Sequence, residues 1–178
     1  AARDAVFKIL AKESLSIHEK LIVILDMGSK IQQCINTDEY DNIKSVVNDY
    51  LKEGIAHTLD ETRNLSDSGQ FEDISLQQGI RQILYPYEEM EVLNPEWEVI
   101  LKDIIDSLFE QMSDEEYNIL NEEFGTYMVS RAYEYRQLLE YLVFRYFAKS
   151  IYDYDFLGKC QMLVTNFFVI RQMDIIRW

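Results

Sequence analysis

Residues 133–178 read YEYRQLLEYLVFRYFAKSIYDYDFLGKCQMLVTNFFVIRQMDIIRW, and this stretch decides the fold. Nine of the 24 residues from Tyr133 to Phe156 are aromatic, and cations and acids stand among them at helical spacing. Such a segment is too apolar for a helix that lies in solvent, so it belongs to a core or to an interface. The pattern predicts two helices, at about 127–152 and 156–176.

The rest of the chain carries the same kind of pattern. Apolar residues recur at spacings of three and four, and the sequence has only two prolines and six glycines. Ser16 and Glu19 have the spacing of a capping box, and Asn94 before Pro95 marks another helix start. No segment alternates with the period of a strand. The sequence therefore predicts an all-α fold, a single domain of about six to eight helices over residues 1–178, packed in two or more layers.

Three interruptions divide this pattern. Residues 61–74 form a polar stretch that reads as a loop, so residues 1–60 and 75–178 are possible sub-units. Pro86 is expected to stop the helix that precedes it. Gly125 is expected to end or kink the helix that Ser113 opens.

The aromatic segment has two faces if it is helical. Tyr135, Leu138, Leu139, Leu142, Tyr146 and Phe147 fall on one face, and Tyr141, Phe144, Arg145, Ala148 and Tyr152 fall on another. The segment is either a central core helix, or a helix whose second face lines a pocket or meets another domain. The spacing places Arg145 one turn after Tyr141, close enough to stack on its ring, and Lys149 one turn before Asp153, close enough to pair with it.

The net charge of −15 is concentrated in the middle of the chain. Residues 85–125 carry 13 acids and one lysine, whereas residues 126–178 carry seven bases and five acids. This distribution excludes a nucleic-acid-binding protein, which needs a basic face. The acids, among them Glu115, Glu116, Glu122 and Glu123, form either a binding face for a basic partner or a solvated face.

No catalytic or metal-binding motif is visible. Cys34 and Cys160 lie far apart without metal-ligand spacing, so each is expected to pack as a small apolar residue. Neither His18 nor His57 lies near a cysteine or a pair of carboxylates at metal-ligand spacing, and His57 is expected near a helix C-terminus. The longest uncharged apolar run, Cys160–Ile170, is too short to span a bilayer. We expect a soluble protein that does not enter a membrane.

Two stretches resemble the flagellin lysine-N-methylase family. They are LLEYLVFRYFAKSIYDYDFLGK at 138–159, followed by FFVIRQ at 167–172, and RDAVFKILAKESLSIHEKLIVILDMGSKIQQCI at 3–35. The resemblance implies methyl transfer from S-adenosylmethionine to lysines of flagellin in the cytoplasm. It also implies a cysteine-rich N-terminal region that holds a metal or iron–sulfur centre and is missing from this chain. The chain would then be the C-terminal fragment, inactive alone, and no metal ligand or catalytic residue carries over.

The resemblance and the charge pattern meet in one hypothesis. The acidic region 85–125 is expected to face a cationic substrate, and the aromatic segment is expected to meet the missing N-terminal domain. The candidate substrate or interface residues are Tyr141, Arg145, Tyr146, Lys149, Tyr152, Asp153, Glu115, Glu116, Glu122 and Glu123. Two alternatives stay open, a ligand-sensing or dimerising domain of a TetR-like regulator and an interaction scaffold.

Overall fold

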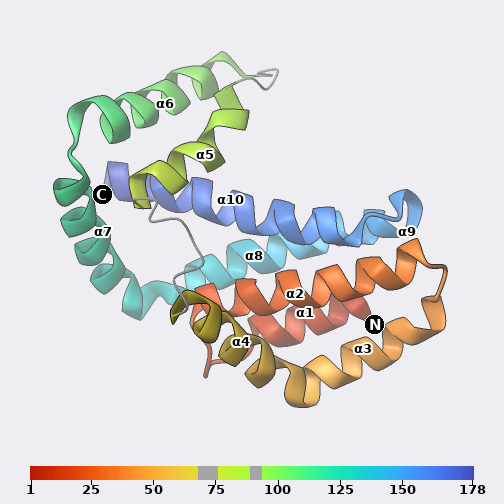
Figure 1. Cartoon of the computed structure of the whole chain (residues 1–178). Coiled ribbons are helices and arrows are strands. Elements are labelled where there is room, and N and C mark those ends of the chain that lie inside the picture. The colour runs from red at the N-terminus through yellow and green to blue at the C-terminus, as the bar shows by residue number, and fades with distance from the viewer. Residues whose placement is uncertain (68–75, 89–93) are drawn as a thin grey trace. The chain divides into compact units, whose positions relative to one another are not determined.

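The computed structural model describes residues 1–67, 76–88 and 94–178 (Figure 1). The α-helices in these ranges are α1 (Ala2–Leu10), α2 (Ile17–Asn36), α3 (Ile43–Asp49), α4 (Ile55–Asp67), α5 (Leu76–Glu88), α6 (Pro95–Asp106), α7 (Asp114–Met128), α8 (Ala132–Tyr146), α9 (Ser150–Asp153) and α10 (Phe156–Arg177). Short 3-10 or π segments are η1 (Tyr40–Asn42), η2 (Tyr50–Gly54), η3 (Ser107–Gln111), η4 (Val129–Arg131) and η5 (Phe147–Lys149). Seven of the α-helices have 12 or more residues, and no described residue is in a strand. The all-α prediction of six to eight helices is confirmed.

The described residues fall into two compact units. Of the described residues, 1–67 and Ala132–Val164 belong to unit 1, and 76–88, 94–131 and Thr165–Trp178 belong to unit 2. These borders differ from the possible sub-units 1–60 and 75–178, because the C-terminal helix α10 contributes its first part to unit 1 and its second part to unit 2.

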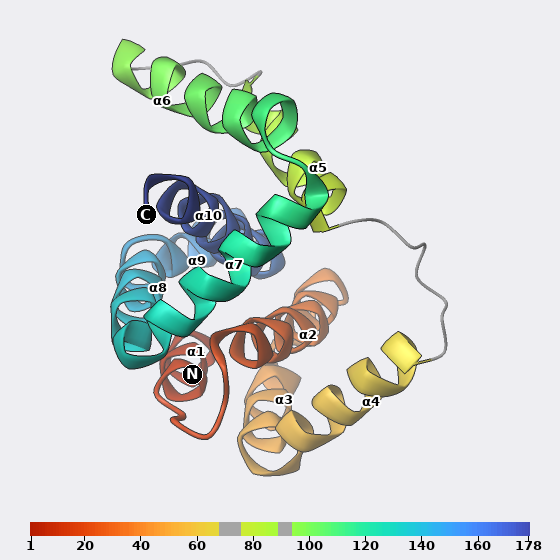
Figure 2. The same cartoon turned by 90° about the vertical axis from the view of Figure 1, so that its left-hand side faces the viewer.

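Helix α2 is the centre of unit 1. Ser16 and Glu19 close the predicted capping box at its start. Its apolar stripe, which includes Leu21, Ile24 and Met27, is buried. In unit 1, α2 contacts α1, α3, α4 and α8, so it is covered on more than one side, as Figure 2 also shows. This is the packing that a layered helical fold requires.

The joint between α9 and α10 is held by one side chain of α2. The Gln32 amide donates to the carbonyl of Tyr154 at 2.9 Å, and its oxygen accepts from the backbone N–H groups of Phe156 and Leu157 at 2.8 and 3.1 Å. Two otherwise unpaired N–H groups at the start of α10 are thereby satisfied. Tyr154 itself lies in the left-handed region, with φ 55°.

Helix α6 of unit 2 begins where the sequence predicts a helix start. Asn94 caps α6 by accepting from the N–H of Glu96, with Pro95 at the first helical position. Tyr117 of α7 and Gln172 of α10 are buried and joined by a 2.6 Å hydrogen bond. Unit 2 therefore contains a polar contact inside its apolar core.

Four local predictions are wrong. Helix α4 runs through Asp67, so the first part of the predicted loop 61–74 is helical, whereas 68–74 lies outside the described residues. Within this helical part the hydroxyl of Thr62 donates to the carbonyl of Thr58, one turn earlier.

Pro86 lies inside α5 instead of stopping it, in the last turn, where a proline removes few helical bonds. Gly125 neither ends nor breaks α7, which continues to Met128. His57 lies near the start of α4 and not at a helix end, because helical backbone continues from Ile43 to Asp67. Stabilisation of a positive charge by the helix macrodipole therefore does not explain the position of His57.

None of the helices in the described parts of the chain is long and apolar enough to cross a membrane.

Candidate functional site

The predicted core face of α8 and η5 is packed inside unit 1. Tyr135, Leu139, Leu142 and Phe147 are buried, as the pattern indicates. The ring of Phe147 packs edge-on against Phe156 with centroids 5.5 Å apart. This side of the aromatic segment is therefore a core helix face.

The second face is exposed. We call Tyr141, Phe144, Arg145, Ala148, Ile151 and Tyr152 the aromatic face; all six are exposed. Phe144 on α8 is 71% exposed and Tyr152 on α9 is 85% exposed, which is unusual for two large aromatic side chains of one segment. Apolar surface of this kind marks interaction sites.

The predicted pairing of Lys149 with Asp153 is wrong. Arg145 and Lys149 both lie over the ring of Tyr146, at 5.7 and 5.5 Å from its centroid, and Arg145 also interacts with Tyr141, one turn before it. Asp153 instead accepts a 2.5 Å hydrogen bond from Lys159, because α10 turns back at the joint and brings that ammonium group to the end of α9. This hydrogen bond lowers the pKa of Asp153.

The four predicted acids lie on α7, in unit 2. Glu115, Glu116, Glu122 and Glu123 are all exposed. Glu116 also closes the capping box by accepting from the N–H and the hydroxyl of Ser113, so its carboxylate is already used in the fold. Ile119 lies between these acids on the helix and is 54% exposed. We call these five residues the acidic stripe.

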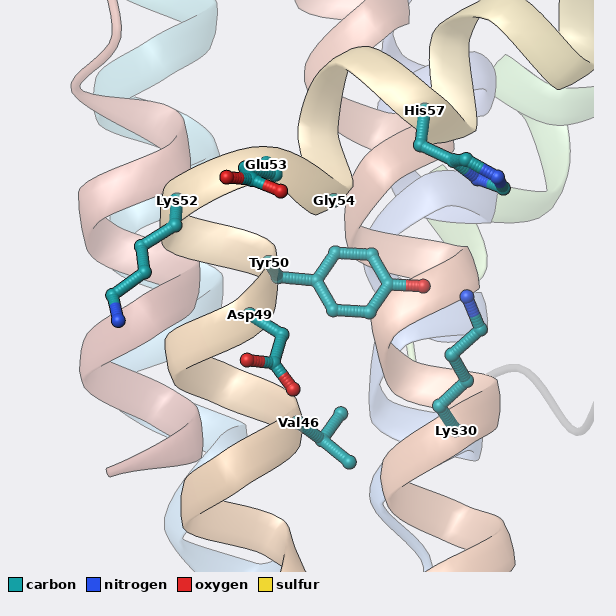
Figure 3. Close-up of a pocket in the computed structure, with 8 residues that line it drawn as sticks. All are labelled: Lys30, Val46, Asp49, Tyr50, Lys52, Glu53, Gly54 and His57. Carbon is teal, nitrogen blue, oxygen red and sulfur yellow. The ribbon is translucent and has the colours of Figure 1, made fainter.

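Unit 1 contains a groove that the sequence does not single out (Figure 3). It has a volume of about 640 Å³ and lies against α2, α3, η2 and α4; its lining is Lys30, Val46, Asp49, Tyr50, Lys52, Glu53, Gly54 and His57. Most of these side chains are exposed, but Tyr50 is buried, with 3% of its surface accessible. We call this hollow the Tyr50 groove.

A hydrogen-bond network fixes the tyrosine. The Tyr50 hydroxyl donates to Asp26 Oδ2, and the Thr58 hydroxyl donates to the same oxygen at 2.7 Å. Lys30 Nζ lies 3.4 Å from that oxygen and 4.9 Å from the centroid of the Tyr50 ring. Burial favours the protonated form of Asp26, but the hydrogen bonds from Tyr50 and Thr58 outweigh it, so the pKa of Asp26 is lowered. The carboxylate is thus ionised at neutral pH.

The backbone beneath the tyrosine has an uncommon conformation. The segment η2 is π-helical, and π-helical turns occur often at functional sites. A Cβ on Gly54 would lie 3.3 Å from the Tyr50 ring, closer than most such contacts, so glycine lets the ring lie against the backbone. The sequence contains one signal for this site, because Asp26 interrupts the apolar run LIVILDMG at 21–28.

The described residues contain no set of side chains for the implied metal centre, and the Tyr50 groove does not suit S-adenosylmethionine. No group of three or more His, Cys, Asp or Glu in 1–67, 76–88 and 94–178 could hold a metal ion. Cys34 and Cys160 are free and buried, and burial raises the pKa of the Cys160 thiol to about 12. The Tyr50 groove offers charged side chains and a covered ring, not the apolar slot that the adenine of S-adenosylmethionine needs.

Comparison with known proteins gives one result. No curated protein and no solved structure matches the chain. A protein family matches residues 3–178, and its description is FliB lysine N-methylase C-terminal domain. The match includes both stretches of sequence that resemble the flagellin lysine-N-methylases. The chain therefore belongs to the family of FliB lysine N-methylase C-terminal domains.

Proposed function

We propose that the chain is the helical C-terminal portion of a protein-lysine N-methyltransferase that acts on flagellin in the cytoplasm. The family supports this proposal, because its description is that of a lysine N-methylase. S-adenosylmethionine, bound by the rest of the enzyme, supplies the methyl group. The substrate lysine must lose its proton and be aimed at that methyl group. On this proposal the present chain helps to bind and position the protein substrate and is inactive alone.

The observation that carries the proposal is the exposed aromatic face. A C-terminal domain of a larger enzyme must contact the rest of that enzyme, and Phe144 and Tyr152 offer the apolar surface for it. Arg145 and Lys149 flank these rings and add positive charge. Tyr141, Tyr146 and Asp153 lie on the same segment and complete the junction with the N-terminal domain that we infer.

The acidic stripe has a separate role in this proposal. Its carboxylates raise the local concentration of a protein that presents lysines, and exposed Ile119 offers an apolar contact beside them. The stripe needs no defined pocket for this role, because steering acts over a Debye length of about 8 Å at physiological salt.

The test replaces two residues of the aromatic face in the full-length enzyme. The variant Phe144→Ser/Tyr152→Ser removes apolar surface without disturbing the core, since both side chains are exposed. We expect flagellin methylation, followed by intact mass, to slow at least about tenfold, the equivalent of about 1.4 kcal/mol.

The matched control is Val99→Ser on α6, a side chain that is 61% exposed and lies in unit 2. The control should leave the rate unchanged. Methylation at the wild-type rate in the double variant would contradict the proposed junction.

The two alternatives receive no support. A ligand-sensing domain of the TetR-like kind needs a closed apolar cavity between its helices, whereas the Tyr50 groove has a charged rim. No observation on the described residues favours a pure scaffold over an enzyme portion.

A further inference from the structure

We propose that the Tyr50 groove is a binding site for an alkylammonium group, the side chain of a substrate lysine, at the place that Lys30 now fills. This inference rests on the proposed function, which requires a lysine side chain to be held. It goes further by assigning a site in a part of the chain that neither the acidic stripe nor the aromatic face includes.

The fixed part of the site combines an aromatic ring with a carboxylate. Asp26 holds the Tyr50 hydroxyl and the Thr58 hydroxyl, and all three side chains come from helical backbone within unit 1. An aromatic face beside a carboxylate is the arrangement by which proteins bind ammonium and methylated ammonium groups. The network therefore prepares the ring for a cation, and does so at a buried position.

The cation now present is Lys30. Its ammonium group lies 4.9 Å from the ring centroid and 3.4 Å from Asp26, and the side chain is about half exposed, at 49%. An exposed lysine with several rotatable bonds can turn into solvent without disturbing the core. The Tyr50 ring is nearly inaccessible although it lines the groove, so a ligand reaches it only where a side chain above it moves.

The rim of the groove suits the same ligand. Asp49 and Glu53 provide carboxylates on the side of α3 and η2, while the side chain of Lys52 points away from the ring in Figure 3. Val46 provides an apolar contact for a methylene stem. Because Gly54 has no side chain, the Tyr50 ring lies directly against the backbone of η2.

The experiment measures binding to the 178-residue chain by NMR, without a methyl donor. The probe is Nα-acetyl-lysine N-methylamide, and the norleucine analogue, which lacks the ammonium group, is the matched negative probe. Wild-type protein should bind the lysine probe weakly, with shifts centred on Tyr50 at millimolar concentration. Lys30→Ala should bind it at least tenfold more tightly, because the intramolecular competitor is gone. Lys52→Ala, on the same groove, should behave as wild type.

Three results would overturn the inference. They are equal affinity of Lys30→Ala and wild type, equal binding of the norleucine probe, and binding that survives in Lys30→Ala/Tyr50→Leu. A fourth arm uses n-butylammonium: if it binds and the capped lysine does not, the site does not hold a protein lysine and the assignment fails. If circular dichroism shows that Lys30→Ala does not fold, the titrations of the wild-type protein decide. The Tyr50 signals should then shift with the lysine probe and not with the norleucine probe, and any other result overturns the inference. These measurements involve no catalysis, so their failure is distinct from failure of the methylation test on the aromatic face.

Discussion

The hydroxyl of Tyr117 donates a 2.6 Å hydrogen bond to the side-chain oxygen of Gln172, and both side chains are buried in unit 2. The contact joins α7 to the second part of α10. Tyr117→Phe removes the donor and leaves a buried amide oxygen without this partner. We expect the free energy of unfolding to fall by about 1–3 kcal/mol. Urea denaturation followed by circular dichroism measures it.

Tyr133→Phe is the control for this change, because Tyr133 is exposed on α8. It should alter the free energy of unfolding by less than about 0.5 kcal/mol. An equal loss of unfolding free energy in the two variants would show that the buried hydrogen bond contributes no more to stability than an exposed hydroxyl does.

The second prediction concerns the cap that α2 supplies to α10. Gln32→Ala leaves the N–H groups of Phe156 and Leu157 without their partner, and it also frees the carbonyl of Tyr154. We expect a loss of about 1–2 kcal/mol, as for removal of a helix cap. Thermal unfolding measures it, with Gln33→Ala as the neighbouring exposed control. A melting temperature equal to that of the control would argue against a capping role.

The third prediction compares two glycines in helices. A Cβ on Gly28 would lie 2.7 Å from Cys160 Sγ, so Gly28→Ala forces α2 and α10 to shift within unit 1. We expect it to destabilise the protein by about 1–3 kcal/mol. A Cβ on Gly79 meets nothing within 4 Å, so Gly79→Ala should stabilise by about 0.5–1 kcal/mol through helix propensity. In chemical denaturation we expect the two substitutions to change the free energy of unfolding in opposite directions. A change in the same direction would contradict the prediction.

Much of the fold could be predicted from local patterns. Capping boxes and apolar stripes act within one helix, so Ser16, Asn94 and Ser113 each predict a helix start that the structure confirms. The two faces of the aromatic segment also follow from helical spacing alone. These features need no knowledge of the rest of the chain.

The features that could not be predicted from the sequence depend on contacts between segments that lie far apart along the chain. Lys159 reaches Asp153 only because the α9–α10 joint turns back, and Gln32, more than 100 residues away, fixes that turn. The Tyr50 groove needs α2 beside η2, since Asp26 and Tyr50 come from different helical segments. Helical periodicity within one segment carries no such information, so the site could not be predicted from it.

The fourth prediction concerns the acidic stripe. In the full-length enzyme, Glu115→Lys/Glu122→Lys reverses two exposed charges and leaves the capping residue Glu116 in place. We expect the KM for flagellin to rise severalfold at low salt, with little change in kcat, because steering acts on encounter. The effect should shrink above about 0.3 M salt. Unchanged KM at low salt would contradict substrate steering.

The fifth prediction is a pH dependence that comes from Asp26. Its pKa is below the ordinary aspartate value when the protein is folded, because the hydrogen bonds from Tyr50 and Thr58 outweigh the effect of burial. A group whose pKa is lowered by folding stabilises the protein above its unfolded pKa of about 3.9, and that contribution is lost as the pH falls through the folded pKa. Asp26→Asn should therefore lower the free energy of unfolding by about 1–3 kcal/mol at pH 7.

The difference between wild type and Asp26→Asn should then narrow as the pH falls below the unfolded pKa of about 3.9, because the unfolded chain takes up a proton there before the folded protein does. Urea titrations at several pH values measure this difference directly. Asp103→Asn, an exposed position on α6, should change stability by less than about 0.5 kcal/mol at pH 7. A difference that stays constant down to pH 3 would mean that the charge of Asp26 contributes nothing to the fold. The network around Tyr50 would then owe its stability to its hydrogen bonds and not to the negative charge of Asp26.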